Sequence, residues 1–140
     1  MKIAIIGSMQ FAEDMVKIKK QLDELGHTAE VPLGTASHLK DKEFVDNLDD
    51  NLEWCITNDI MRRNFQQVAE SDAVLVLNYK RNGIEGYIGI SALMEMGVAH
   101  YLKKKIFLIQ HTPDYKNARW AHEVAIMQPT IIKGDLTKIK

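Results

Sequence analysis

Short runs of β-branched and other apolar residues alternate with longer amphipathic segments along the whole chain. This alternation is typical of a parallel sheet whose strands are buried on both faces by the connecting helices. The expected strands are Lys2–Ile6, Thr28–Val31, Ala73–Leu77, Lys105–Ile109 and Thr130–Ile132. We therefore predict an α/β fold with a mainly parallel sheet of these five strands and with helices on both of its faces.

The segments between these runs carry apolar residues at helical spacing. Phe11–Leu25 predicts a helix that stops at Gly26, a common helix C-terminal signal. The helical spacing continues through residues 41–70, but Thr57–Asp59 offers capping side chains in the middle, which favours two consecutive helices. No linker or repeat interrupts the 140 residues, so we expect one domain with the flavodoxin-like or Rossmann-like strand order 2-1-3-4-5.

Composition narrows the class of partner. Eighteen basic and 19 acidic side chains give a formal net charge of −1, which favours a small molecule over nucleic acid or an anionic membrane. The apolar runs fall far short of the roughly 20 residues of a membrane span, so we expect a cytoplasmic protein. Cys55 is the only cysteine and is expected to be a buried structural thiol.

The sequence motifs for cofactors are missing. No His or Cys residues stand at metal-ligand spacing, and neither a Walker loop nor a GxGxxG fingerprint is present. We therefore expect no metal and no cofactor.

Three loops are expected at the carboxyl ends of the strands, where open α/β sheets bind ligands. Gly7–Gln10 forms a tight turn into a helix. The long segment Asn78–Ile90 carries several glycines and suits a mobile lid, although an ordinary surface loop has the same composition. The third loop follows Ile109, and its polar side chains either close the pocket or are solvated: Gln110, His111, Asp114 and Tyr115.

Two carboxylates are the candidate catalytic groups. Glu95 lies in the opening turns of an apolar helix beside Gly97. Burying a carboxylate costs free energy, so its presence on a mostly buried helix indicates a role. A glutamate in this position is also favoured by the helix dipole without any further role. Asp72 precedes a predicted strand, where it either serves the site or satisfies the end of the preceding helix. The candidate substrate-binding residues are Gly7, Ser8, Met9, Asn78, Gly89 and Ser91.

Four segments in this order resemble the nucleoside 2-deoxyribosyltransferase superfamily, which includes the deoxynucleoside 5′-monophosphate N-glycosidases. They are Lys2–Met9 (KIAIIGSM), Ser71–Val76 (SDAVLV), Glu95–Ala99 (EMGVA) and Lys105–Leu108 (KIFL). The resemblance implies that Glu95 is the nucleophile on the sugar anomeric carbon and that Asp72 helps to bind and protonate the departing base. It also implies that Ser8 lies by the sugar or its 5′ group. Ser91 would then lie opposite Ser8, at the start of a helix.

Two positions depart from the family pattern. Ala4 stands where the family usually has a tyrosine that orients the catalytic glutamate, and Gly89–Ala92 (GISA) replaces the usual D-x-G-T. Transfer to another base, hydrolysis by water, and a non-catalytic nucleotide-sensing role all remain open, with a nucleoside or its monophosphate as the ligand.

The resemblance further implies a homo-oligomer, at least a dimer. The residues expected to be available for such contacts are Met94, Met96, Tyr101 and Trp120.

Overall fold

The computed structural model describes all 140 residues and contains one parallel sheet with the strand order β2-β1-β3-β4-β5. Every neighbouring pair of strands is parallel, so the predicted fold class and strand order are confirmed. The strands are β1 (Lys2–Gly7), β2 (Thr28–Glu30), β3 (Ala73–Leu77), β4 (Lys105–Leu108) and β5 (Thr130–Ile131).

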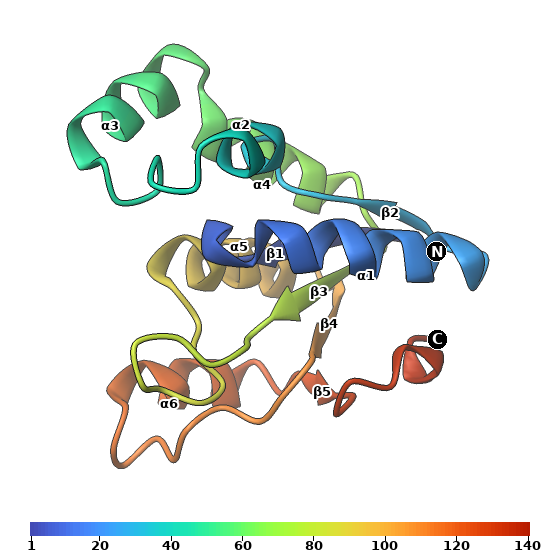
Figure 1. The fold of residues 1–140 in the computed structure, drawn as a ribbon. Helices are drawn as coiled ribbons and strands as arrows, with labels where there is room; N and C mark the ends of the chain where they lie inside the picture. Colours follow the sequence, from blue (N-terminus) through green and yellow to red (C-terminus); the bar gives the residue numbers. More distant parts are fainter.

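Six α-helices and two short 3-10 turns connect or follow the strands. The helices are α1 (Ala12–Glu24), α2 (Thr35–Lys40), α3 (Leu48–Thr57), α4 (Ile60–Ala69), α5 (Ile90–Tyr101) and α6 (Arg119–Ile126). The 3-10 turns are η1 (Met9–Phe11) and η2 (Leu136–Lys138). Figure 1 shows α1 lying across one face of the sheet, with α5 on the other side of the strands.

Successive residues of the central strands point alternately into two separate hydrophobic cores, one on each face of the sheet. Ile3 and Ile5 of β1 pack toward Met15 on α1, whereas Ile6 packs toward Met96 on α5. Side chains of successive strand residues point to opposite faces, and both faces of this sheet are apolar. A strand in the middle of such a sheet must therefore be apolar throughout, as the fully buried β3 is.

Most of the expected helices are present, but the helical pattern predicted from residue 41 becomes a helix only at Leu48, where α3 begins. The predicted break between two helices is confirmed: α3 ends at Thr57, and Asp59 adopts a left-handed conformation (φ 48°) before α4 begins. Helix α2, only six residues long, was not expected from the sequence. None of the helices combines the length and the apolar character that crossing a bilayer requires.

Two of the four residues expected at an oligomer interface lie elsewhere. Met96 is 0% exposed and belongs to the core beneath α5, so its expected availability is wrong. Trp120 is half-buried against that core, with its ring 6.4 Å from the ring of Tyr87. Met94 and Tyr101 do face outward, because they lie on the side of α5 turned away from the sheet.

Candidate functional site

A cavity of about 470 Å³ opens at the carboxyl ends of β1 and β3, beside the start of α5. Its polar side comes from the strand ends and from α5, and its apolar side comes from the segment containing α2, α3 and α4. The polar side includes Gly7, Ser8, Arg81, Ser91 and Glu95, and the apolar side includes Val45, Leu48, Trp54 and Ile60. A cavity of this size and mixed character suits a small organic ligand.

Glu95 lies in this cavity, as its place after a strand-loop-helix junction indicates. The residue is only 6% exposed, and no protein group donates a hydrogen bond to its carboxyl group. Burial raises the pKa of Glu95 to about 7, because the charged form loses hydration. The carboxyl group is thus available to a ligand in either protonation state near neutral pH.

The turn after β1 lines the cavity beside the carboxyl ends of the strands. Gly7 has φ +152°, and a Cβ at this position would lie 2.9 Å from the carbonyl oxygen of Leu77 on the neighbouring strand. A side chain would therefore push β1 and β3 apart, which explains the glycine. Ser8 follows and caps η1, accepting a hydrogen bond from the N–H of Gln10 (3.4 Å). Met9 also lines the cavity.

The start of α5 contributes two more of the predicted residues. Gly89 is the extended N-cap residue of the helix, and Ser91 lies in its first turn; both line the cavity with Glu95. Ala4 packs in the core on the α5 side of β1. Its methyl group cannot orient a carboxylate by hydrogen bonding, unlike the tyrosine of the family pattern.

Arg81 is the principal residue that the sequence analysis missed. It comes from the loop after β3, its side chain is 18% exposed, and it reaches across to the turn after β1. Its Nη1 donates a hydrogen bond to the Oγ of Ser8 (2.9 Å), and its guanidinium carbon lies 5.3 Å from the ring centroid of Tyr87. A single arginine in a polar loop gives no sequence signal, because only the fold decides whether it turns inward.

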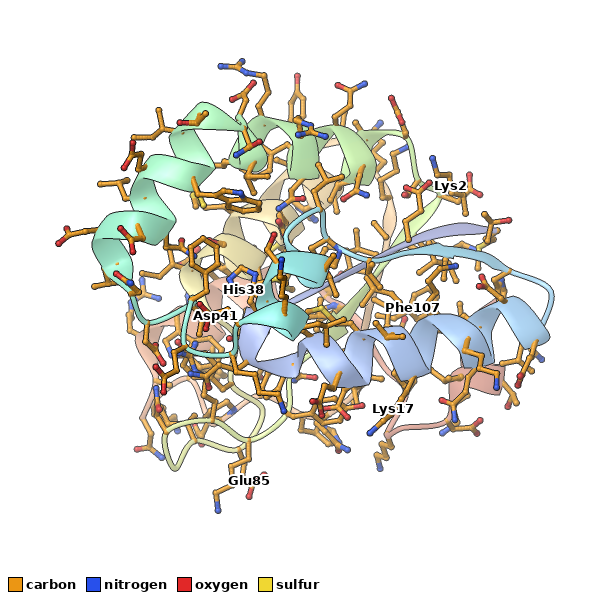
Figure 2. The ribbon with its side chains drawn as sticks, turned by 45° about the horizontal axis from the view of Figure 1, so that its top comes forward. Lys2, Lys17, His38, Asp41, Glu85 and Phe107 are labelled. Atoms are coloured by element: carbon orange, nitrogen blue, oxygen red, sulfur yellow. The ribbon has the colours of Figure 1, made fainter.

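Asp72 does not line the cavity, so the structure does not bring it together with Glu95 as the sequence led us to expect. The Asp72 carboxylate accepts a hydrogen bond from the N–H of Lys2 (2.7 Å), at the amino end of the sheet. From Asp72 to the carboxyl end of β3 at Leu77 the extended chain spans about 17 Å, at roughly 3.3 Å per residue. In Figure 2, Lys2 and the cavity residue His38 lie well apart, on different sides of the molecule.

Asn78 supports the site and does not line the cavity, which corrects its predicted role in substrate binding. It is 0% exposed and exchanges two hydrogen bonds with the backbone of Gln110. The Asn78 Nδ2 donates to the carbonyl oxygen (2.8 Å), and its Oδ1 accepts from the N–H (2.9 Å). The side chain thus joins the loops that leave β3 and β4, and no polar atom of its amide is left without a partner.

Aromatic side chains stiffen the apolar wall. The rings of His38, Phe44 and Trp54 pack against one another, with centroids 5.2 Å to 6.5 Å apart. Cys55 was expected in the core but is only partly buried and lines the cavity, where its thiol donates to the Oδ1 of Asn51 (3.4 Å). Burial raises the pKa of Cys55, which disfavours the reactive thiolate and agrees with a structural role.

The loop expected to be a lid is held in place at several points. Arg81 and Ile84 form a short antiparallel bridge, and a Cβ on Gly86 would lie 1.9 Å from the carbonyl oxygen of His111. The loop after β4 therefore braces the loop after β3 from outside. Its side chains at Gln110, His111, Asp114 and Tyr115 do not line the cavity.

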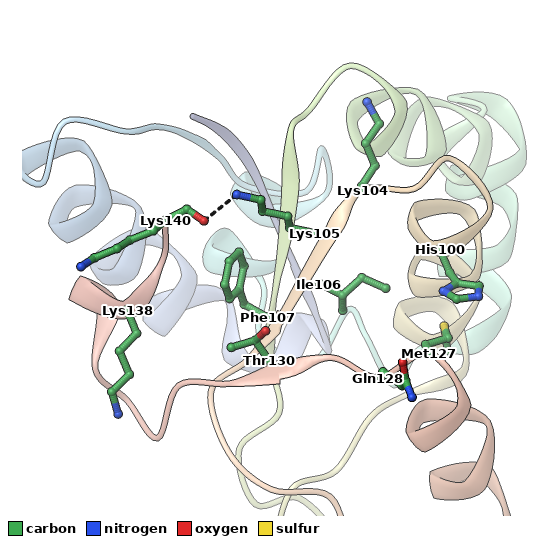
Figure 3. Close-up of a pocket in the computed structure, with 10 residues that line it drawn as sticks. All are labelled: His100, Lys104, Lys105, Ile106, Phe107, Met127, Gln128, Thr130, Lys138 and Lys140. Atoms are coloured by element: carbon green, nitrogen blue, oxygen red, sulfur yellow. Dashed lines mark hydrogen bonds between the residues drawn. The ribbon is translucent and has the colours of Figure 1, made fainter.

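A second groove, of about 410 Å³, lies near the amino ends of β4 and β5 and is rich in lysine. Figure 3 shows that Lys104 and Lys138 point in different directions, so their charges do not converge on one point. The ammonium group of Lys105 is bound to the carbonyl oxygen of Lys140 (2.7 Å). The groove is therefore a weaker candidate than the cavity at Glu95. No three His, Cys, Asp or Glu side chains are grouped so that they could hold a metal ion.

No protein-family model matches the chain, and no curated protein sequence matches it.

Proposed function

We propose that the cavity binds a 2-deoxyribonucleoside or its 5′-monophosphate and that Glu95 cleaves the N-glycosidic bond. The observation that carries this proposal is a buried carboxyl group without a protein hydrogen-bond donor, at the ligand-binding edge of a parallel sheet. The resemblance of the segments around Ser8 and Glu95 to the nucleoside 2-deoxyribosyltransferase superfamily supports the same chemistry.

In this reaction a carboxylate oxygen of Glu95 bonds to the anomeric carbon as the bond to the base nitrogen breaks. The base leaves with the bonding electron pair, and the sugar is held as an ester of Glu95. Water then releases the sugar, or a second base takes it, and in either case the carboxylate is regenerated. The negative charge of Glu95 also stabilises the positive charge that develops on the sugar ring.

The departing base needs a proton, and its proposed donor in place of Asp72 is His38, the histidine that lines the cavity. Its Nδ1 donates to the carbonyl oxygen of Gly34 (2.7 Å), which fixes the ring. The proton must then come from Nε2 of the doubly protonated ring, whose nearest polar neighbour is the amide nitrogen of Asn51 (3.5 Å). His38 thus takes the acid role that the sequence resemblance gave to Asp72.

A non-catalytic nucleotide-sensing role is the second candidate, and two observations favour it. Ala4 leaves Glu95 without the orienting tyrosine of the family, and burial raises the pKa of Glu95 to about 7. A neutral carboxyl group donates a hydrogen bond to a sugar hydroxyl and does not attack carbon.

Release of free base from the common 2′-deoxynucleosides and their 5′-monophosphates tests the proposal. Glu95→Gln should keep the fold and lower the rate of base release by at least about 100-fold, or about 2.7 kcal/mol of transition-state stabilisation. The control is Glu85→Gln, which alters an 80% exposed carboxylate on the loop after β3. Unchanged turnover in Glu95→Gln would exclude Glu95 as the nucleophile.

The pH dependence separates the two candidates. A nucleophile must be ionised, so kcat/KM should rise with pH through about 7, the pKa of Glu95, and should fall again at higher pH once His38 loses the proton that it donates. A sensor that uses the neutral carboxyl group should instead bind its ligand more tightly below that pH. Ligand binding that weakens above pH 7, without base release from any compound, would favour the sensor.

We also propose that the chain forms a homo-oligomer through α5. An apolar surface groove on α4 and α5 is lined by Phe65, Met94, Val98, Tyr101 and Leu102. Tyr101 is 83% exposed, and so large an apolar face is typical of an interface with another protein surface. Because Glu95 follows Met94 on the same helix, docking of a second copy here would also hold the catalytic helix in place.

A further inference from the structure

The apolar side of the cavity is the part that suits a flat nucleobase. Helices α2, α3 and α4 form this side and lie together near the top of Figure 1, whereas Glu95 comes from α5. In the proposed reaction the anomeric carbon lies at Glu95, so the base takes the remaining, apolar side, where the ring of Trp54 lines the cavity. The hydrogen-bonding groups on this side then determine which base fits.

Two asparagine side chains, Asn51 on α3 and Asn64 on α4, line this side of the cavity. The amide of Asn51 is engaged at both ends within the protein. Its Nδ2 donates to the carbonyl oxygen of Phe44 (3.2 Å), and its Oδ1 accepts from the thiol of Cys55 (3.4 Å). Asn51 therefore holds the wall together and offers a base little.

Asn64 is engaged at only one end of its amide. It lies one turn after Ile60 on α4, so the two side chains share the helix face that lines the cavity. The Oδ1 of Asn64 accepts from the N–H of Leu33 (3.2 Å), which fixes the amide orientation because an N–H requires the oxygen opposite it. The Nδ2 group has no acceptor in the protein, yet it is not closed off from solvent.

The backbone oxygens on either side of Leu33 also line the cavity, but both are fully engaged. The oxygen of Pro32 accepts from the hydroxyl (2.7 Å) and the N–H (3.0 Å) of Thr35. The oxygen of Gly34 accepts from Nδ1 (2.7 Å) and the N–H (3.1 Å) of His38. A carbonyl oxygen has two lone pairs, so neither group has one left for a ligand.

This part of the wall thus presents a free donor, the Nδ2 of Asn64, beside oxygens that are already taken. An oxo group on a base accepts a hydrogen bond from Nδ2. An amino group at the same ring position would point its own hydrogens at Nδ2 and be left without a partner. A site that leaves a buried polar group unpaired rejects that ligand strongly.

We infer that Asn64 selects the base, so that the cavity favours bases with an oxo group over those with an amino group at the same ring position. This inference rests on the proposed function for the sugar and the reaction. Two pairs of compounds differ only in this edge of the base. They are deoxyinosine with deoxyadenosine, and deoxyuridine with deoxycytidine.

The test measures binding by calorimetry and base release for both pairs, each as nucleoside and as 5′-monophosphate. Wild type should favour the oxo compound at least about tenfold within each pair that it binds, as expected when one hydrogen bond is exchanged for an unpaired donor. Asn64→Asp keeps an oxygen for the N–H of Leu33 but replaces the NH₂ group by an acceptor, so the preference should reverse. Asn64→Leu should bring the two members of a pair within about twofold.

Gln66→Glu is the matched control. It makes the same change from amide to carboxylate on the same helix, but Gln66 is exposed and its Nε2 donates to Glu70 (2.7 Å). Any loss of stability caused by the like charge on Glu70 affects both members of a pair equally. The wild-type preference should therefore persist in this variant.

The possible results separate this inference from the proposed function. Equal wild-type affinity within both pairs, a preference for the amino compounds, or an oxo preference that survives in folded Asn64→Asp overturns the role of Asn64. Base release at equal efficiency within both pairs leaves the glycosidic reaction standing and refutes the selection. An Asn64-dependent preference in binding without any base release supports the selection and contradicts the catalytic role of Glu95.

Circular dichroism and thermal unfolding establish whether the Asn64 variants fold. If Asn64→Asp does not fold, the wild-type preference and its loss in Asn64→Leu decide, and if neither variant folds, the wild-type preference alone decides. A failure of every compound to bind contradicts both the selection by Asn64 and the proposed function.

Discussion

Asp72 and Lys2 join the amino ends of the two central strands through a side chain and a pair of backbone groups. The Asp72 carboxylate accepts from the N–H of Lys2 (2.7 Å), and the Asp72 N–H donates to the Lys2 carbonyl oxygen (2.8 Å). The acid thus fixes where β1 and β3 begin, at the edge of the sheet opposite the cavity.

Asp72→Ala should lower the free energy of unfolding by about 1 kcal/mol, because one hydrogen bond to a charged acceptor is lost at an exposed site. Base release by the folded variant should match that of the wild type. Urea denaturation and the base-release assay measure the two effects. A large loss of turnover at unchanged stability would show that Asp72 takes part in the reaction after all.

Glu95 should make the protein less stable as the pH rises. Its pKa is about 7 in the folded chain and near the ordinary value of 4.5 in the unfolded chain. Between these values the folded state binds more protons than the unfolded state, so stability falls with increasing pH. The expected loss is about 3 kcal/mol between pH 4.5 and pH 7, and it is complete above pH 7.

Denaturant unfolding of wild type and Glu95→Gln between pH 4.5 and pH 8 measures this effect. The difference in stability between the two proteins should shift in favour of the variant as the pH rises, and then become constant. The same difference for the exposed control Glu85→Gln should stay nearly flat. A pH-independent difference for Glu95→Gln would mean that Glu95 has an ordinary pKa in the folded protein.

Asn78→Leu should lower the free energy of unfolding by about 2–3 kcal/mol, because it leaves the backbone N–H and carbonyl of Gln110 without partners. Asn78 is 0% exposed, so water cannot replace its amide without a rearrangement of the loops. Asn117→Leu, at an exposed position, is the control and should have little effect. Equal unfolding midpoints for the two variants would contradict the supporting role of Asn78.

Gly86→Ala and Gly83→Ala form a matched pair on the loop that carries Arg81. Both glycines have positive φ, +69° and +74°, so alanine strains the backbone at either position by about 1 kcal/mol. Only at Gly86 does the new Cβ also collide with the backbone of His111, whereas at Gly83 it meets open space. Gly86→Ala should therefore cost more stability and displace Arg81, weakening ligand binding, while Gly83→Ala should leave binding intact.

Tyr101→Lys should shift the protein toward the monomer in sedimentation velocity, because it places a charge in the apolar face proposed to bind a second copy. Tyr115→Lys alters a 49% exposed tyrosine away from that face and serves as the control. A wild type that is monomeric at micromolar concentration would refute the proposed oligomer. Oligomers that persist in Tyr101→Lys would place the interface elsewhere.

The sequence determined the sheet, because burial of both faces of a parallel sheet requires uninterrupted apolar strands such as Ala73–Leu77. It also determined that Glu95 lies at the ligand-binding edge, since every strand-to-helix connection in such a sheet leaves from the carboxyl ends. The same polarity places a residue that precedes a strand, such as Asp72, at the other edge.

Only the tertiary structure decided which loop residues turn into the cavity. Asn78 and Arg81 stand three positions apart in one polar loop, and nothing local distinguishes an amide that ties two loops from a guanidinium that faces a ligand. Their roles depend on Gln110 and Ser8, which are brought to them by β4 and β1 from positions distant in the chain. Local patterns fix periodicity and burial, but the partner of a polar side chain is set by long-range packing.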